Sequence, residues 1–172
     1  MKRHSSAASL VLALLAVLGL AGPVAAGEQV PFKGRFAGVV IVTGGPSILF
    51  AAVDATGNAT DLGQFTLAIP HQVNRGTSPF PFPWTSTGSY QFVAANGDTL
   101  FASFTGQVSS TPTPGVLAAV EIATITGGTG RFAGATGGFT VNRLVYPATL
   151  TAPRTTIGSF NGTISSPGAA GK

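Results

Sequence analysis

Cysteine is absent from this chain of 172 residues, and charged residues make up only 8% of it. The absence of cysteine excludes structural disulfides, thiolate metal sites, thiol nucleophiles and a lipid anchor attached through an N-terminal cysteine. The lysines and arginines are scattered, without a basic run or a basic helix, so the sequence has no footprint for binding nucleic acid. The acidic residues and histidines show no spacing typical of a metal site, and we expect neither a metal nor another cofactor.

After the N-terminal segment the sequence also lacks any long apolar run. The basic opening Met1-Lys2-Arg3-His4 precedes an apolar stretch from Ala7 to Leu20, and the segment closes with the small residues Val24-Ala25-Ala26. This order is typical of a cleavable signal peptide, and the stretch falls short of the ~20 residues of a membrane-spanning helix. We therefore expect cleavage between Ala26 and Gly27, and a secreted or periplasmic product, residues 27–172, that forms one domain without a stable membrane anchor.

The remaining sequence shows no apolar residues at helical spacing. Short stretches of Val, Ile, Thr and Phe are punctuated by Gly, Pro, Asn and Asp, which predicts an all-β chain. We expect eight strands, at about residues 33–42, 48–53, 60–73, 85–93, 99–108, 116–126, 138–146 and 156–165. A two-sheet sandwich and a closed barrel both suit such a chain. A membrane-spanning barrel is a third architecture, but Thr, Ser and Gly interrupt both faces of the strands.

Two segments between and within these strands have a pattern of their own. Alternation in the third strand places Phe65, Leu67, Ile69, His71 and Val73 on one face. Between residues 74 and 84, prolines alternate with aromatic residues, and proline cannot donate a hydrogen bond to a sheet. This segment is therefore predicted to be an extended loop or an edge.

A glycine-rich segment, residues 125–139, is the most distinctive part of the chain. Within it, Gly128-x-Gly130-x-x-Ala133 satisfies the dinucleotide-binding fingerprint in form, but that fingerprint needs a helix after the glycines. The residues that follow, Phe139-Thr140-Val141, predict a strand. The sequence therefore argues against a nucleotide site.

The run from Thr126 to Gly137, with Leu144-Val145-Tyr146-Pro147 after it, resembles the barrel family of plant allene oxide cyclases and dirigent proteins, which includes small exported bacterial members. The resemblance implies an eight-stranded antiparallel barrel and association into dimers or trimers. It also implies a structural turn with an aromatic plug beneath the barrel end, formed by Gly127, Gly128, Gly130, Phe132, Gly134 and Gly137. No catalytic residue is carried over, because the cyclase machinery includes a cysteine and the first strand here has no acid.

Three polar residues are candidates for chemistry. His71 is the only histidine after the signal segment, and it is either a general base or, as we expect, a hydrogen-bonded residue at a barrel rim. If the strands on either side of Gly130 pair, Glu121 lies close to Arg143. We expect a partly exposed ion pair worth ~1 kcal/mol or less, and the alternative is a pair inside the barrel.

Two functions follow as hypotheses. The first is an exported, non-catalytic barrel that binds a small apolar molecule at its mouth, with aromatic residues 80, 82 and 84 as a lid. The second, implied by the resemblance, is an isomerase or cyclase that confines a reactive intermediate. A surface protein acting through its outer face is a third reading. For the first two, the candidate pocket residues are His71, Trp84, Tyr90, Glu121 and Arg143.

Overall fold

The structure, a computed structural model, describes residues 28–165, and the predicted signal peptide lies outside them. Eight strands account for most of the described chain. They are β1 (Gln29–Gly44), β2 (Ile48–Ala59), β3 (Gly63–Asn74), β4 (Trp84–Ala94), β5 (Thr99–Ser110), β6 (Leu117–Gly128), β7 (Gly137–Tyr146) and β8 (Thr155–Ser165), with a short 3-10 helix, η1 (Gly130–Phe132), before β7. The described residues contain no helix that is long and apolar enough to cross a membrane.

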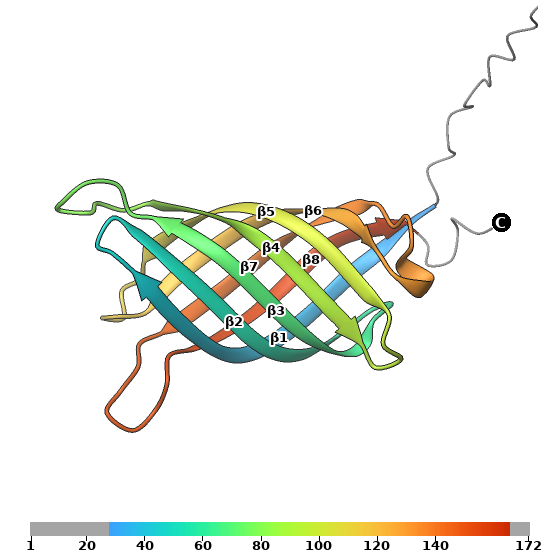
Figure 1. Cartoon of the computed structure of the whole chain (residues 1–172), viewed down its shortest axis with the longest axis horizontal. Helices are drawn as coiled ribbons and strands as arrows, with labels where there is room; N and C mark the ends of the chain where they lie inside the picture. The colour runs from blue at the N-terminus through green and yellow to red at the C-terminus, as the bar shows by residue number, and fades with distance from the viewer. Residues whose placement is uncertain (1–27, 166–172) are drawn as a thin grey trace, which may run out of the picture.

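The eight strands form a closed antiparallel barrel (Figure 1). Each strand pairs with its neighbours in sequence, and β8 closes the ring by pairing with β1. The predicted all-β fold and strand count are confirmed, and closure decides for the barrel over the sandwich. Full closure leaves no unpaired sheet edge.

The connections gather at the two ends of the barrel. Four of them protrude at one end, which we call the loop end; they are residues 45–47, 75–83, 111–116 and 147–154. The opposite end, which we call the closed end, carries the connections 60–62, 95–98 and 129–136 and both termini of the described chain (Figure 1). The predicted proline-rich loop is the one at 75–83.

Side chains alternate between the interior and the outer wall, as the period of a strand requires. In β3 the predicted inner face is confirmed, because Phe65, Leu67, Ile69, His71 and Val73 are all buried. β3 begins at Gly63 rather than at residue 60, since Asp61 adopts a φ of 61° and turns the chain there.

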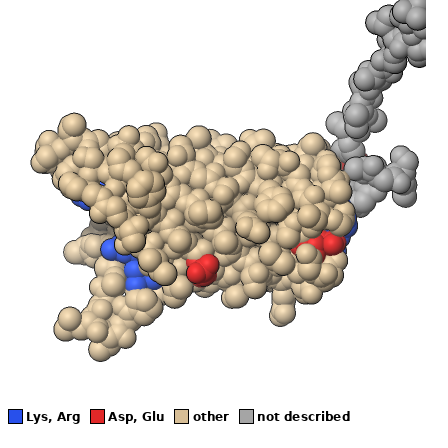
Figure 2. All heavy atoms as spheres, viewed as in Figure 1, with Lys and Arg blue, Asp and Glu red and all other residues tan. Residues whose placement is uncertain are grey.

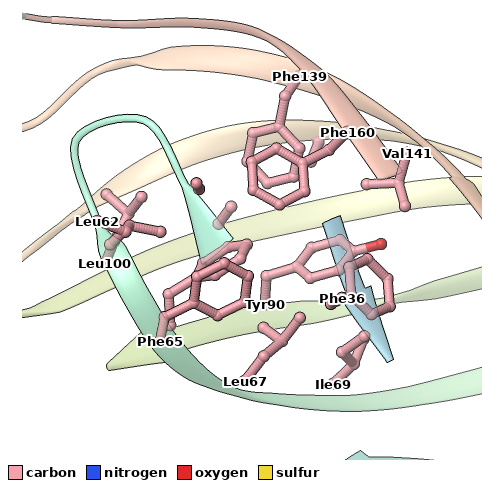
Figure 3. Close-up of a cluster of buried hydrophobic side chains, with 14 of the residues drawn as sticks. Phe36, Leu62, Phe65, Leu67, Ile69, Tyr90, Leu100, Phe139, Val141 and Phe160 are labelled. Carbon is pink, nitrogen blue, oxygen red and sulfur yellow. The ribbon is translucent and has the colours of Figure 1, made fainter. Parts of the chain in front are cut away.

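Aromatic rings fill the interior toward the closed end. Their centroids lie 4.9 to 6.3 Å apart in edge-on and tilted contacts, and the group consists of Phe32, Phe65, Phe92, Phe139 and Phe160. Figure 3 shows the rings of Phe139 and Phe160 meeting inside the barrel. Because such rings pack as densely as an organic crystal, this half of the barrel is solid.

The glycine-rich segment closes the same end. Phe132 is fully buried in the core, while positive φ values occur at Gly127, Gly130, Gly134 and Gly137. Gly128 has no positive φ, but a Cβ there would lie 2.1 Å from the carbonyl oxygen of Thr99. The three-residue helix η1 leads into a strand, so the helix that a dinucleotide site needs is not formed.

Candidate functional site

Four ionisable side chains meet in the middle of the barrel. They come from four strands and form the polar cluster, which consists of His71 (β3), Tyr90 (β4), Glu121 (β6) and Arg143 (β7). All four are buried. Along each strand, aromatic or aliphatic residues lie on the closed-end side of the cluster, and the loop end lies on the other.

Glu121 and Arg143 form an ion pair inside the barrel. The Arg143 Nη2 and Nε atoms donate to Glu121 Oε1 at 2.7 and 3.0 Å, and both side chains are almost completely buried. The predicted proximity is confirmed, but the expectation of a partly exposed pair was wrong. Period two places both residues on the inner face, since Glu121 is paired with Val141 and Arg143 follows two residues later.

His71 is held by both of its ring nitrogens. Its Nδ1–H donates to the carbonyl oxygen of Ile69 at 3.0 Å, and its Nε2 accepts from Arg143 Nη2 at 3.0 Å. Burial and then the Arg143 charge lower the pKa of His71. A neutral ring with no spare lone pair cannot abstract a proton, so in this arrangement His71 orients Arg143 rather than acting as a base.

We predict that the protein loses stability as the pH falls below 6.5, the ordinary pKa of histidine. There the unfolded chain gains a proton at His71, whereas the folded chain resists it because the pKa is lowered. Since the unfolded state then binds more protons, the free energy of unfolding falls by up to about 1.4 kcal/mol per pH unit. Urea denaturation of the protein and of His71→Gln, which keeps an acceptor for Arg143, measures this between roughly pH 5 and 7. Equal slopes in the two proteins would contradict it.

Tyr90 closes the cluster from the side of the aromatic core. Its hydroxyl donates to Glu121 Oε2, and its ring stacks on Phe92. Burial, and then the negative charge of Glu121, raise the pKa of Tyr90 well above its ordinary value. The phenol therefore keeps its proton and supplies the buried carboxylate with a hydrogen bond.

Three inward-facing glycines make room for these side chains. In the register of the sheet, Gly88 lies opposite His71, Gly106 opposite Glu121 and Gly158 opposite Arg143. A Cβ at Gly106 would lie 2.7 Å from Glu121 Cγ, and one at Gly88 would lie 2.5 Å from His71 Cβ. His71 and Glu121 thus occupy volume that Gly88 and Gly106 leave free, whereas at Gly158 the ring of Phe36 comes closer than Arg143 does.

A cavity of about 260 Å³ lies between the polar cluster and the loop end. His71 and Arg143 form its floor, and most of its wall is apolar, including Val40, Leu49, Ala51, Val73, Val108, Leu117 and Val145. Tyr90 and Glu121 are not among its lining residues, so the sequence-based placement of these two in the pocket was wrong: they lie beneath the floor. Arg143 is the group that links them to the cavity.

The proline-rich loop stands at the mouth of this cavity. Trp84 lines the cavity, stacks on Phe82 with ring centroids 4.3 Å apart and donates from Nε1 to the carbonyl oxygen of Phe80. The guanidinium of Arg75 lies 4.4 Å from the Phe80 ring centroid and 4.6 Å from that of Trp84. These contacts fix the loop across one side of the mouth.

Two lining residues, Arg75 and Arg154, were missed in the sequence. Both face the cavity at the loop end. Each is an end residue of a long loop, Arg75 the first residue of 75–83 and Arg154 the last residue of 147–154, and this position was the available signal. Only the pairing of distant strands brings these two loops to one mouth.

The chemistry that this site offers is hydrogen-bond donation from a fixed cation. Nε and Nη2 of Arg143 are used by Glu121 and His71, while none of the described residues accepts from its Nη1. A carbonyl or oxyanion in the cavity could take these remaining N–H groups. Among residues 28–165 there is no group of three or more His, Asp or Glu side chains that could hold a metal.

Comparison with known proteins yields a likeness of fold. No family model matches the chain, and no curated protein does either. Among solved structures, the pterocarpan synthase dirigent protein GePTS1 is 16% identical over 84% of this chain and 89% of its own, with a TM-score of 0.49. The pterocarpan synthase dirigent protein PsPTS1 is 14% identical over 81% of this chain and 96% of its own, with a TM-score of 0.48. At such values neither a residue's role nor an activity is transferred.

Proposed function

We propose that the protein binds a small, largely apolar molecule in the loop-end cavity, with a carbonyl or other oxygen acceptor of that molecule held by Arg143. The observation that carries this proposal is an apolar cavity with the buried guanidinium of Arg143 at its floor. None of the described residues accepts a hydrogen bond from Nη1 of this guanidinium. Pockets for small ligands combine such walls with a few fixed polar groups. Buried aromatic side chains pack the closed-end half of the barrel, and the cavity lies on the other side of the polar cluster, toward the loop end.

The direction of binding follows from the position of the charges. Glu121 neutralises Arg143 from beneath the floor, and His71 fixes the guanidinium from the side. A ligand that enters with its oxygen first therefore meets donors already aligned, and no side chain needs to reorganise. A hydrocarbon without that oxygen would leave the same donors unpaired, which lowers affinity.

The test is calorimetric titration with a ketone and its hydrocarbon counterpart, butyrophenone and butylbenzene. We expect the ketone to bind about tenfold more tightly, the effect of a hydrogen bond to a charged group. The double variant Glu121→Leu/Arg143→Met should abolish this difference while preserving the hydrophobic wall. Equal affinities in the unsubstituted protein would contradict the role of Arg143.

A matched pair of variants tests the location of the ligand. Ala51 lines the cavity, whereas the next residue, Ala52, lies on the outer wall of the same strand. Ala51→Leu fills the cavity and should remove binding, while Ala52→Leu should leave the affinity unchanged. The emission of Trp84, the single tryptophan, reports occupancy in both variants. If neither compound changes that emission or releases heat, the proposal fails.

A second candidate function, an isomerase or cyclase that confines a reactive intermediate, is favoured by one observation. Four ionisable groups are buried directly beside an apolar chamber, and Arg143 is placed to stabilise an oxyanion that develops on a bound carbonyl. We rank it second because His71 has no free lone pair to act as a base. The ketone is also incubated with the protein in heavy water. Incorporation of deuterium at the carbon beside its carbonyl, faster than in heavy-water buffer without the protein, would reverse this ranking.

A further inference from the structure

The two ends of the barrel differ in charge. The four connections at the loop end contain Arg75 and Arg154 and no acidic residue. The connections at the closed end carry Asp61, Asp98 and Arg131. In Figure 2, the side chains that are coloured at the end where the loops protrude are cationic, whereas acidic ones lie on the wall and, beside a cationic one, at the opposite end. Among the described residues neither loop-end arginine forms a salt bridge.

The loop end also presents apolar side chains to solvent. Leu150 is fully exposed at the tip of the β7–β8 loop, and Phe82 is 39% exposed in the β3–β4 loop. On the adjoining wall, Ile41 and Phe50 are more than half exposed. Other exposed apolar residues, such as Ile122 and Phe101, lie elsewhere on the wall, but at the loop end such residues adjoin loops that carry cations and no acid. An exposed apolar patch of this kind marks a surface that meets a partner.

The β7–β8 loop forms hydrogen bonds within itself beneath Leu150. The backbone N–H of Thr149 donates to the carbonyl oxygen of Ala152, and the Thr149 hydroxyl oxygen accepts from the N–H groups of Thr151 and Ala152. The turn beneath Leu150 thus satisfies much of its own backbone polarity. Unpaired backbone groups are what makes an irregular loop costly to bring into an apolar medium.

We propose that the loop end docks reversibly on an anionic lipid surface, with Leu150 and Phe82 entering the interface and the positive charges of Arg75 and Arg154, which line the cavity mouth, attracting the lipid head groups. Apolar insertion together with attraction between cations and anionic lipids is the combination that holds peripheral proteins on membranes. The absence of acidic residues from the four loops removes the repulsion that would oppose such docking. The mouth of the cavity then opens toward the membrane.

This proposal is independent of the ligand, so we test it with the protein alone. Protein purified from the secretion route of an expressing host, with its N-terminus established by mass spectrometry, is mixed with vesicles and sedimented. We expect binding to phosphatidylcholine vesicles that contain phosphatidylglycerol, weaker binding to phosphatidylcholine alone, and weakening by salt. A failure to bind vesicles would not affect the interpretation of the ligand titrations, and a failure to bind ligand would not affect the interpretation of the vesicle experiment.

Matched variants assign the docking to the loop end. Arg154→Gln should lower the partition coefficient about fivefold, whereas Arg35→Gln, an exposed arginine on the wall of β1, should not. Leu150→Ser should lower it about tenfold, and Ile122→Ser, which removes an exposed residue from the wall of β6, should not. Thermal unfolding of each variant establishes that it is folded.

Three results would overturn the proposal. The first is equal binding to neutral and anionic vesicles, and the second is an effect of Leu150→Ser no larger than that of Ile122→Ser. The third is retention on an anionic polymer without acyl chains, such as dextran sulfate resin, that is as strong as binding to the anionic vesicles. This result would assign the loop end to a polyanion instead of a lipid surface.

Discussion

Replacing Glu121 with glutamine is expected to lower the free energy of unfolding by about 3–5 kcal/mol, one of the two largest effects that we predict for this protein. The substitution keeps the shape of the side chain but removes its charge, which leaves Arg143 inside the barrel without a counter-ion. It also removes the ionised acceptor of the Tyr90 hydroxyl. For a chain of this length, such a loss lowers the thermal midpoint by about 10 °C.

The control is the double variant Glu121→Leu/Arg143→Met. Replacing a buried ion pair by apolar residues of similar volume is often neutral or stabilising, so we expect this variant to regain most of the loss. Urea denaturation of the three proteins gives the comparison directly. If the glutamine variant is as stable as the unsubstituted protein, the pair is not held in an environment of low dielectric, and the buried cluster is wrong.

Replacing Phe92 with alanine is expected to cost a similar 3–5 kcal/mol, for a different physical reason. Phe92 is fully buried, and its ring meets those of Phe32, Phe65, Tyr90, Phe139 and Phe160 at centroid distances of 5.3 to 6.1 Å. Removing the ring opens a void that a closed barrel cannot collapse to fill, because the hydrogen-bonded strands hold its wall in place. Lost transfer energy and the empty volume then add.

Phe101 offers a matched control on the next strand. It lies on the outer wall of β5 and is 38% exposed, so Phe101→Ala should change stability by no more than about 0.5 kcal/mol. Calorimetric thermal unfolding of both variants measures the difference. Similar losses at the two positions would mean that the closed-end half of the barrel is not the packed aromatic core described above.

Local pattern was sufficient for the strands and their faces. The alternation in β3 predicted five inward residues, and burial confirms all five, because the period of two is a property of the strand itself. The proximity of Glu121 to Arg143 was also accessible, since β6 and β7 are consecutive antiparallel strands and a register centred on the glycine-rich connection places the two residues near each other. Contacts between strands adjacent in sequence are thus readable from the sequence.

Contacts between distant strands were not readable in this way. Nothing local indicates that His71 accepts from Arg143, 72 residues away, or that Tyr90 donates to Glu121. The inward glycines at 88, 106 and 158 were a usable signal that passed unnoticed, since glycine inside a strand often marks the close approach of another group. Their partners, however, depend on the register of three separate ladders.

The sequence by itself determined that this is an all-β chain of eight strands without disulfides, with an apolar inner face in β3, because composition and periodicity act residue by residue. The tertiary structure decided that the sheet closes, that four polar groups meet at its centre, and that two arginines share a mouth with a cavity. Closure has this effect because the pairing of β1 with β8 encloses the inner faces of all eight strands in one interior, where side chains from distant strands come into contact. The ion pair expected near the surface is buried for the same reason.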